Sequence, residues 1–376
     1  MPNLKLLIAA DFVPQERVLS LIKTDNYCFF DDIRRFTNRA DYSIINMEAP
    51  VVHEGLSNPI RKTGPNLWCP KNTIKSIQYG GFNAVTLANN HYRDYGQNGV
   101  ECTLAACIEA RIDYVGGGAD FHESRKILYK EINGIRLAII NVCEHEWSVA
   151  TDEYGGSNPL NPLRQYYDII AAKRRALYVV VIVHGGTEWY NLPTPRMKET
   201  YRFFIDAGAD AVINHHQHCY SGYEVYNGKP IFYGLGNFCF DKGKTDRTFW
   251  NEGYMVMFNM NDGSINYELI PYVQCAGEPT ISILEDRKEF DNSIKILNAI
   301  IADDNALKRE FKELAMKRER VIKNFMAPYS SLFLQRLLAK KLLPSFCSKK
   351  RLMQLLAQSQ CESHRDLMIE YLHSIT

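Results

Sequence analysis

Short apolar runs alternate with amphipathic segments over roughly the first 280 residues, and this pattern predicts an α/β domain. Segments with helical spacing of apolar positions lie between several of the runs, at 72–79, 99–110 and 198–207. The apolar runs that predict buried strands are 4–10, 42–47, 82–88, 177–183 and 211–213. Strands that alternate with helices in this way are typical of a parallel or mixed sheet.

Three later turn signals predict β-hairpins within the same domain. Asn133-Gly134 and Asn227-Gly228 each separate two runs rich in β-branched and aromatic residues, and Asn-Gly is the preferred two-residue hairpin turn. A third hairpin is expected around Asn261-Asp262-Gly263. The strand-rich pattern stops near Pro279, so we predict a first domain over residues 1–280.

Residues 284–376 have helical spacing and predict an all-helical, basic C-terminal extension. Between Asn305 and Arg351 there are thirteen Lys and Arg against three Glu, an excess of ten positive charges. Residues 332–343 predict an amphipathic basic helix, which suits a membrane surface, an anionic polymer or a partner protein. A docked helix with a solvated basic face explains the same pattern.

Composition narrows the classes of function. The net charge is +1, which disfavours a chain that binds nucleic acid along its whole length, and we expect no nucleic-acid partner. The ten cysteines include no CxxC pair and are expected to be reduced thiols. The first apolar run ends at Asp11 and predicts a strand rather than an export signal. We therefore expect a cytoplasmic protein, associated peripherally with the inner membrane if the basic helices bind there.

Polar side chains follow the apolar runs at the point where each predicted strand ends. Because the carboxyl ends of parallel strands meet at one edge of a sheet, these side chains are expected to converge. Each also has a structural interpretation: an aspartate caps helices, asparagines stabilise turns, and histidines can form a hydrogen-bonded cluster. The residues concerned are Asp11, Glu48, Asn90, His184, His216 and His218.

The combination of donors points to a transition-metal site. Carboxylate, amide oxygen and imidazole together suit Mn, Fe or Zn. One or two divalent ions are expected, and two ions need a bridging carboxylate. Such a site binds a phosphate-like oxyanion and activates water. The candidate catalytic residues are His91, as general acid for the leaving oxygen, and Glu188.

These motifs give the chain a family resemblance. Together they resemble the CapA family of bacterial capsule and poly-γ-glutamate synthesis proteins, a branch similar to the calcineurin-like metallophosphoesterases. They occur in family order over about residues 4 to 241. The matching segments are Ala10-Asp11, Asn46-Met-Glu48, Leu87-Ala-Asn-Asn-His91 with Asp94-Tyr-Gly96, His184-Gly-Gly-Thr-Glu188, Gly208-Ala-Asp-Ala-Val-Ile-Asn-His-His-Gln-His218, and Tyr233-Gly-Leu-Gly-Asn-Phe238.

The resemblance implies a fold and a set of roles. It implies a four-layer α/β/β/α sandwich of metallophosphoesterase type, with the metals at one edge. It places Asp11 and His218 at one metal and Glu48 in the bridging position. It places the other metal at Asn90, His184 and His216, with His91 near the substrate.

Four positions depart from the family pattern. Ala10 and Asn214 each stand where the family usually has Gly. Val13 stands where the wider phosphoesterase group has the His of Asp-x-His, and Glu48 replaces the usual bridging Asp. These changes leave the first metal site with fewer of the usual ligands, so one tightly held metal is an alternative to two.

Two functions from different classes follow. The first is a metal-dependent, phosphoesterase-like hydrolase of an anionic or phosphate-bearing substrate, serving capsule or surface-polymer biosynthesis. The second is a non-catalytic assembly factor that keeps the fold and works beside other capsule-synthesis proteins. A nuclease-like role is a weaker third hypothesis, because the basic excess lies outside the domain that contains the motifs.

Overall fold

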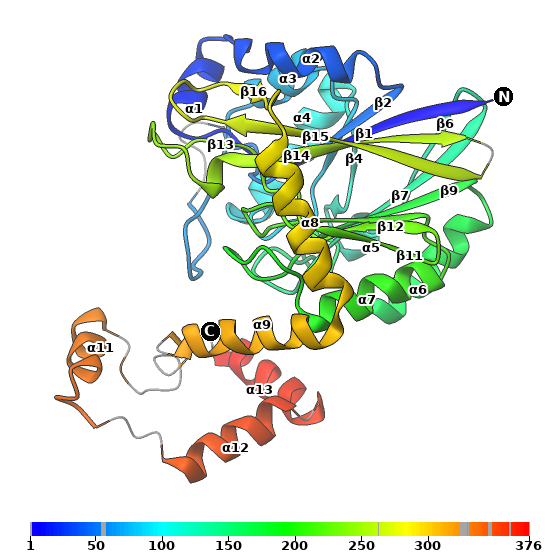
Figure 1. Cartoon of the computed structure of the whole chain (residues 1–376). Coiled ribbons are helices and arrows are strands. Elements are labelled where there is room, and N and C mark those ends of the chain that lie inside the picture. The colour runs from blue at the N-terminus through cyan, green and yellow to red at the C-terminus, as the bar shows by residue number, and fades with distance from the viewer. Residues whose placement is uncertain are drawn as a thin grey trace. The chain divides into compact units, whose positions relative to one another are not determined.

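The chain folds as a mixed α/β protein, as predicted (Figure 1). The computed structural model describes residues 2–53, 58–261, 263–319, 321–322, 329, 331–344, 348–360 and 362–375. Contacts divide the chain into two units, Met1–Leu307 and Lys308–Thr376. Helix α8 (Lys288–Ala302) lies in the first unit, where it packs on β11. The domain boundary between 280 and 284 stays a prediction.

The first sheet has eight strands and contains the N-terminus of the chain. Strands β1 to β4 pair in parallel, whereas β14, β15 and β16 add an antiparallel edge. Strand β13 pairs in parallel with the end of β1. In sheet order the strands are β16 (Ile281–Ile283), β15 (Ser264–Gln274), β14 (Glu252–Asn261), β1 (Asn3–Val13), β2 (Tyr42–Met47), β3 (Ala84–Thr86) and β4 (Asp113–Val115), with β13 at Asn237–Phe240.

The second sheet has six strands, of which β7, β9, β10 and β12 run in parallel. Both predicted Asn-Gly hairpins lie at its edges, as β6–β7 and β11–β12. A separate two-stranded sheet pairs β5 (Gly117–Gly118) with β8 (Gly156–Ser157). In sheet order the six strands are β11 (Tyr223–Tyr226), β12 (Lys229–Phe232), β10 (Ala211–His215), β9 (Tyr178–His184), β7 (Ile135–Cys143) and β6 (Leu128–Ile132).

The two sheets share a hydrophobic core. One buried cluster joins Ile8 and Ile44 of the first sheet to Ile139 and Val180 of the second. The neighbouring Val179 is also buried, because alternate residues of β9 face the helices that cover the sheet's other side. This burial on both faces explains why β9 is a continuous apolar run in the sequence.

Helices cover the outer faces of both sheets. Figure 1 shows α2 and α3 beside the first sheet and α6 and α7 beside the second, where they contact β9 and β10. Asn161 and Thr194 cap α6 and α7, and a proline follows each cap. The helices of this unit are α1 (Glu16–Lys23), η1 (Cys28–Phe30), α2 (Asp31–Thr37), α3 (Asn72–Tyr79), α4 (Gly96–Ala110), α5 (Phe121–Ser124), α6 (Pro162–Lys173), α7 (Pro195–Asp206), η2 (Phe249–Asn251) and α8.

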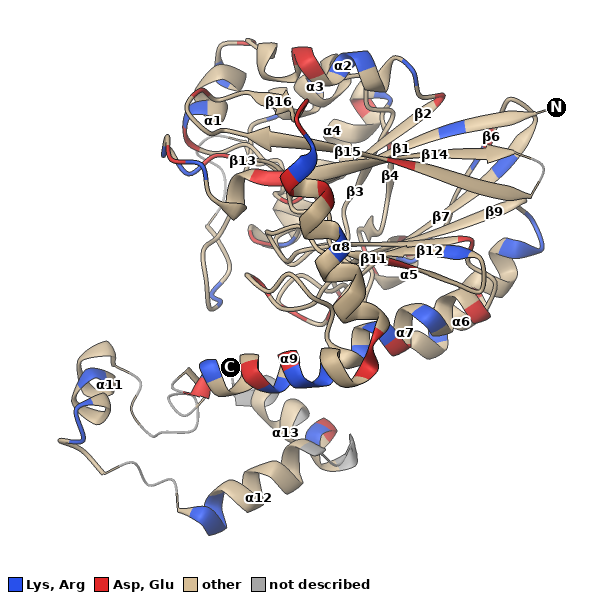
Figure 2. Cartoon of the chain, in the orientation of Figure 1, with Lys and Arg blue, Asp and Glu red and all other residues tan. Residues whose placement is uncertain are grey.

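The described part of the second unit is helical, as predicted. The side chain of Ser331 caps α11 (Leu332–Ala339), which covers most of the predicted basic helix. Figure 2 marks Lys and Arg positions on the ribbon of α9 (Asp304–Lys317), α11 and α12 (Lys349–Gln360). Helix α13 (Glu362–Ile375) follows. No helix in the described ranges is both long and apolar enough to cross a bilayer. Partner binding by this segment stays a prediction.

Candidate metal centre

Strand register places polar residues of both sheets at matching levels. In the first sheet, Asp11 of β1 is level with Asn46 of β2 and Asn237 of β13. In the second sheet, His184 of β9 is level with His215 of β10. Both sets lie at the carboxyl ends of parallel strands, which is the edge of the sheet where ligands bind in α/β proteins. Convergence of the predicted residues therefore follows from the sheet topology.

The carboxylate of Asp11 is buried and fully engaged by the protein. Asn46 Nδ2 donates to Asp11 Oδ1 at 2.7 Å, and the backbone N–H of His216 donates to Oδ2 at 3.1 Å. His215 Nδ1 lies 3.2 Å from Oδ1. Burial alone would raise the pKa of Asp11, but the contact with His215 holds it well below its ordinary value. Asp11 is therefore an ionised carboxylate with a fixed orientation.

His184 lies at the middle of the group. Its Nε2 is 3.0 Å from Asn90 Oδ1, 3.1 Å from His216 Nδ1 and 3.4 Å from Glu48 Oε1. Three side chains that are far apart in the sequence thus meet around one imidazole nitrogen. The backbone carbonyl of Asn90 is fixed in turn, because Ser148 Oγ donates to it at 2.7 Å.

The loop after β10 holds His216 and His218 in an unusual backbone conformation. Their φ angles are +95° and +55°, in the left-handed region that costs non-glycine residues about 1–3 kcal/mol. The loop is held by the Asp11 contact to His216 and by His218 Nδ1, which lies 2.8 Å from Asn237 Oδ1. The strain is therefore offset by contacts that aim both imidazoles at the cluster.

Glu48 is the one carboxylate of the cluster that the protein leaves unsatisfied. It is fully buried, and neither of its carboxylate oxygens has a hydrogen-bond partner among the described residues. It also belongs to both groups of side chains whose ligand atoms lie within 4.8 Å of one another. These groups are Glu48 with His184 and His216, and Glu48 with Asp11 and His218. Buried anions without partners are costly, so the site is suited to a cation.

The electrostatics of the cluster agree with that conclusion. Burial, followed by the charge of Asp11, raises the pKa of Glu48 well above its ordinary value. Burial also lowers the pKa of His184 well below its ordinary value and that of His218 to about 4. Both imidazoles are therefore neutral near pH 7, which is the form that binds metals. Two carboxyl groups beside neutral imidazoles form a ligand set that a divalent ion would complete.

His91 lies on the loop after β3 and is held by charged neighbours. Its Nδ1 is 2.6 Å from Asp94 Oδ2 and 3.2 Å from Lys62 Nζ, and Lys62 also pairs with Asp94. All three side chains are nearly or fully buried. Asp94 therefore fixes the His91 ring through Nδ1, which leaves Nε2 as the nitrogen for a second partner.

Comparison with known proteins assigns the family. The family described as "Bacterial capsule synthesis protein PGA_cap" matches residues 5–242, most of the first unit. The chain belongs to the PGA_cap family. The resemblance to CapA proteins that the motifs predicted is thereby confirmed.

Two curated relatives show how much of this PGA_cap protein is shared with CapA proteins. "Capsule biosynthesis protein CapA" of Bacillus anthracis is 35% identical over 259 residues, 66% of this chain and 62% of that protein. "PGA biosynthesis protein CapA" of Bacillus subtilis (strain 168) is 32% identical over 246 residues, 64% of each chain. The chain thus matches less than two thirds of either relative's length.

A solved structure of a hypothetical protein from Thermus thermophilus has a TM-score of 0.46 to this PGA_cap protein. The two are 16% identical, and the alignment covers 72% of this chain and 98% of the other. No conclusion on fold or function rests on a likeness this low.

The cluster of the PGA_cap domain contains all six predicted ligand residues, whereas Glu188 lies beside it. Glu188 follows the His184-Gly-Gly turn and is partly exposed. Its negative charge adds to the rise in the pKa of Glu48 that burial and Asp11 cause, and it opposes the fall in the pKa of His218. The charge of Glu188 therefore acts on the cluster from its border.

Several residues of the site had not been singled out from the sequence. Asn46 and Asn237 lie within the matching segments but had no role assigned, and their contacts orient Asp11 and His218. Glu146 also lies at the site, because its Oε1 is 3.5 Å from His216 Nε2 and its Oε2 accepts from Asn90 Nδ2. Lys62 contacts His91 although 29 residues separate the two in the sequence. Sequence signals for such contacts are weak because they depend on tertiary register.

The glycines after His184 serve packing within the domain. A Cβ on Gly185 would lie 2.6 Å from Glu144 Cγ. The carboxylate of Glu144 accepts from Gly186 N at 3.0 Å and pairs with Arg196. A pocket of about 280 Å³, lined by Glu144, His145, Leu160, Pro162 and Arg196, adjoins this turn.

Proposed function

We propose that this PGA_cap protein is a metal-dependent, phosphoesterase-like hydrolase in the synthesis of a capsule or related surface polymer, such as poly-γ-glutamate or a polysaccharide. The observation that supports it most is Glu48, a buried carboxyl group common to two ligand groups and without a hydrogen bond among the described residues. We also propose that the two sheets and their helices form the four-layer α/β/β/α sandwich of metallophosphoesterases. Their shared core and covered outer faces support this assignment.

The proposed ligand sets follow from the two groups. Asp11, Glu48 and His218 would hold one divalent ion, and Glu48, Asn90, His184 and His216 the other. Mn, Fe or Zn suits this mixture of oxygen and nitrogen donors. When bound, such ions polarise a phosphoryl oxygen and lower the pKa of water.

His91 is the residue proposed to move a proton. Asp94 accepts at Nδ1, so the ring is held in one orientation and Nε2 is left to donate to a leaving oxygen. Lys62 beside Asp94 balances the charge of this buried carboxylate. Glu188, whose charge acts on Glu48 and His218, would tune the site rather than bind the ion.

The test is turnover of an aryl phosphoester by the full chain loaded with Mn(II) or Fe(II). His91→Ala should lower kcat by about 100-fold or more, the usual contribution of a general acid, with metal content unchanged. The matched control is His122→Ala, because His122 lies on α5 and is exposed. Full activity of His91→Ala, or equal turnover by protein stripped of metal, would contradict the proposal.

A non-catalytic assembly factor is the second candidate function. Val13 is a buried strand residue at the position where the wider phosphoesterase group has a histidine. The ligand group of Asp11, Glu48 and His218 therefore contains only one imidazole. A non-catalytic protein that binds metal but does not hydrolyse substrate would need no second imidazole in this group. Stoichiometric metal with no turnover of phosphomonoesters or phosphodiesters would favour this function over the hydrolase.

A further inference from the structure

A lysine held against two tryptophans lies beside the candidate metal centre. Lys242 follows β13, and its Nζ is 3.2 Å from the ring centroid of Trp250 and 4.1 Å from that of Trp189. The two indoles stack with centroids 4.7 Å apart. Trp250 in turn lies 4.9 Å from His218, centroid to centroid. Lys242 is thus separated from a candidate ligand by a single aromatic ring.

This aromatic group extends from the buried centre to the surface. The exposed fraction is 5% for Trp250, 44% for Trp189 and 53% for Phe249. Phe249 meets Trp189 edge to face, with centroids 5.7 Å apart. Trp189 and Phe249 are thus exposed aromatic side chains beside the buried cluster, and exposed apolar groups with a polar rim commonly mark a ligand site.

The ammonium of Lys242 is held by the ring faces of Trp189 and Trp250. Within the described ranges, no carboxylate lies at ion-pair distance from its Nζ. Burial lowers the pKa of Lys242 to about 8, and the charge of Lys244 adds to this, whereas the charge of Glu188 opposes it. A cation held by ring faces and partly desolvated gains most from an incoming anion.

We propose that Lys242, with Trp189 and Trp250, is a carboxylate-binding subsite that selects a flexible, carboxylate-bearing chain as substrate. This inference rests on the proposed function, in which the metal centre takes the reacting group of a surface polymer. The subsite would bind a neighbouring carboxylate of the same chain. It is distinct from the residues proposed to hold metal.

Two features favour a carboxylate-bearing chain over a sugar polymer or a second phosphate. The ammonium lies over a face of each indole, so a sugar ring would have to displace it to stack there. A single ammonium also differs from the guanidinium forks that are over-represented where phosphates are recognised in a bidentate way. One carboxylate matches one lysine in charge, and a flexible chain can reach it from the metal centre.

The experiment is titration of the full chain with oligo-γ-glutamate at pH 7, followed by tryptophan fluorescence and calorimetry. Lys242→Gln should weaken binding by about tenfold or more, the effect of losing a charged hydrogen bond. The matched control is Lys244→Gln, because Lys244 is exposed and two residues away, and it should stay within about twofold. Lys242 is itself exposed, and its variant should keep the wild-type Tm.

Equal Kd values for wild type and Lys242→Gln would overturn the proposal. Binding of oligogalacturonate with the same dependence on Lys242, and tighter than oligo-γ-glutamate, would overturn the choice of a flexible chain. The titrations are repeated in Glu48→Gln, where the tenfold difference should persist because Glu48 does not contact Lys242. If wild type binds the oligomer through Lys242 but hydrolyses no phosphoester, the hydrolase fails and the subsite stands.

Discussion

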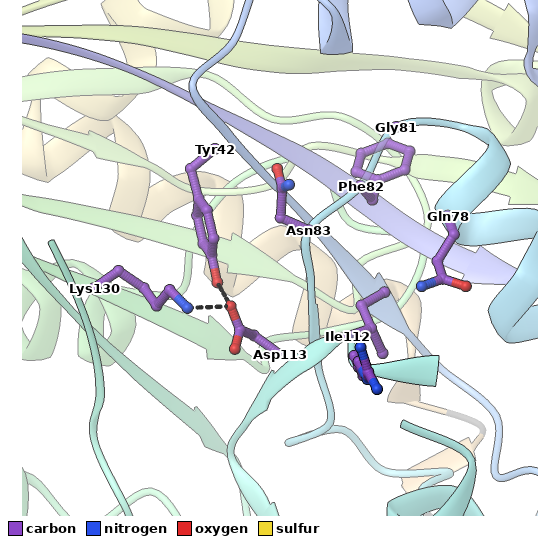
Figure 3. Close-up of a pocket in the computed structure, with 9 residues that line it drawn as sticks. Tyr42, Gln78, Gly81, Phe82, Asn83, Ile112, Asp113 and Lys130 are labelled. Atoms are coloured by element: carbon purple, nitrogen blue, oxygen red, sulfur yellow. Dashed lines mark hydrogen bonds and ion pairs between the residues drawn. The ribbon is translucent and has the colours of Figure 1, made fainter. Parts of the chain in front are cut away.

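The two ends of the same parallel strands have polar clusters of opposite character. At the amino-terminal ends, Asp113 of β4 accepts from Tyr42 of β2 at 2.6 Å and pairs with Lys130 of β6 at 2.8 Å (Figure 3). The cluster borders a pocket of about 400 Å³, and the Asp113 side chain is 33% exposed. At the carboxyl ends, Glu48 is fully buried and lacks any hydrogen bond among the described residues.

The difference lies in how each cluster is neutralised. Asp113 has a hydrogen-bond donor in Tyr42, an ion-pair partner in Lys130 and access to water, so it is stable without a ligand. Glu48 and Asp11 share their site with His184 and His218, whose pKa values burial lowers, so these two imidazoles are neutral near pH 7 and supply no positive charge there. Removing one partner from a satisfied cluster costs stability, whereas a cluster that lacks a cation should gain stability when one binds.

The largest expected effect comes from Glu48→Gln. Because Glu48 belongs to both ligand groups, the substitution should lower the affinity for Mn(II) by about 1,000-fold or more, which corresponds to about 4 kcal/mol. The measurement is a titration with Mn(II) in which binding is monitored through the shift in Tm. Without metal, the variant should be at least as stable as wild type, because an unpaired buried carboxyl group has been replaced by a neutral one.

Two results would break the comparison at this point. One is an unchanged affinity of Glu48→Gln for Mn(II). The other is a wild-type protein whose Tm does not respond to any of Mn(II), Fe(II) and Zn(II). Either would mean that the cluster is complete without a cation, like the one around Asp113.

The strands and the convergence of the six candidate ligand residues could be predicted because both depend on local pattern. A buried parallel strand is a continuous apolar run, and the first polar residue after it marks the sheet edge, as for His184 after β9. The supporting residues could not be predicted in this way. Asn46 lies inside its strand, and its role depends on the register between β1 and β2, where the pairing shifts between Ile8 and Asp11. The contact of Lys62 with His91 likewise depends on how two loops pack.

A smaller effect should appear in how the folding stability of the metal-free protein depends on pH. The pKa of His218 falls from 6.5 to about 4 on folding, so the unfolded chain binds a proton that the folded chain does not. Stability from this group is complete above pH 6.5 and is lost as the pH falls, by about 3 kcal/mol at pH 4. Glu48, whose pKa is raised, acts with the opposite sign.

Comparison of wild type with His218→Gln isolates the histidine, because the Glu48 contribution is common to both. Urea unfolding in EDTA at pH 7 and pH 4 gives the two free energies. The loss between these pH values should be smaller in His218→Gln by about 3 kcal/mol. Equal losses would show that His218 is not a buried neutral imidazole, and the contrast in charge between the two clusters would then disappear.

The smallest expected effect comes from Asp113→Asn at the opposite edge. The substitution weakens one ion pair and one hydrogen bond of a partly exposed group, so it should cost about 1 kcal/mol of stability. Metal affinity should not change, because no ligand group contacts Asp113. Urea unfolding and the Mn(II) titration used for Glu48→Gln measure both quantities. If Asp113→Asn weakened metal binding as much as it destabilised the fold, the two edges would be coupled through strands β2 to β4 and could not be treated as independent clusters.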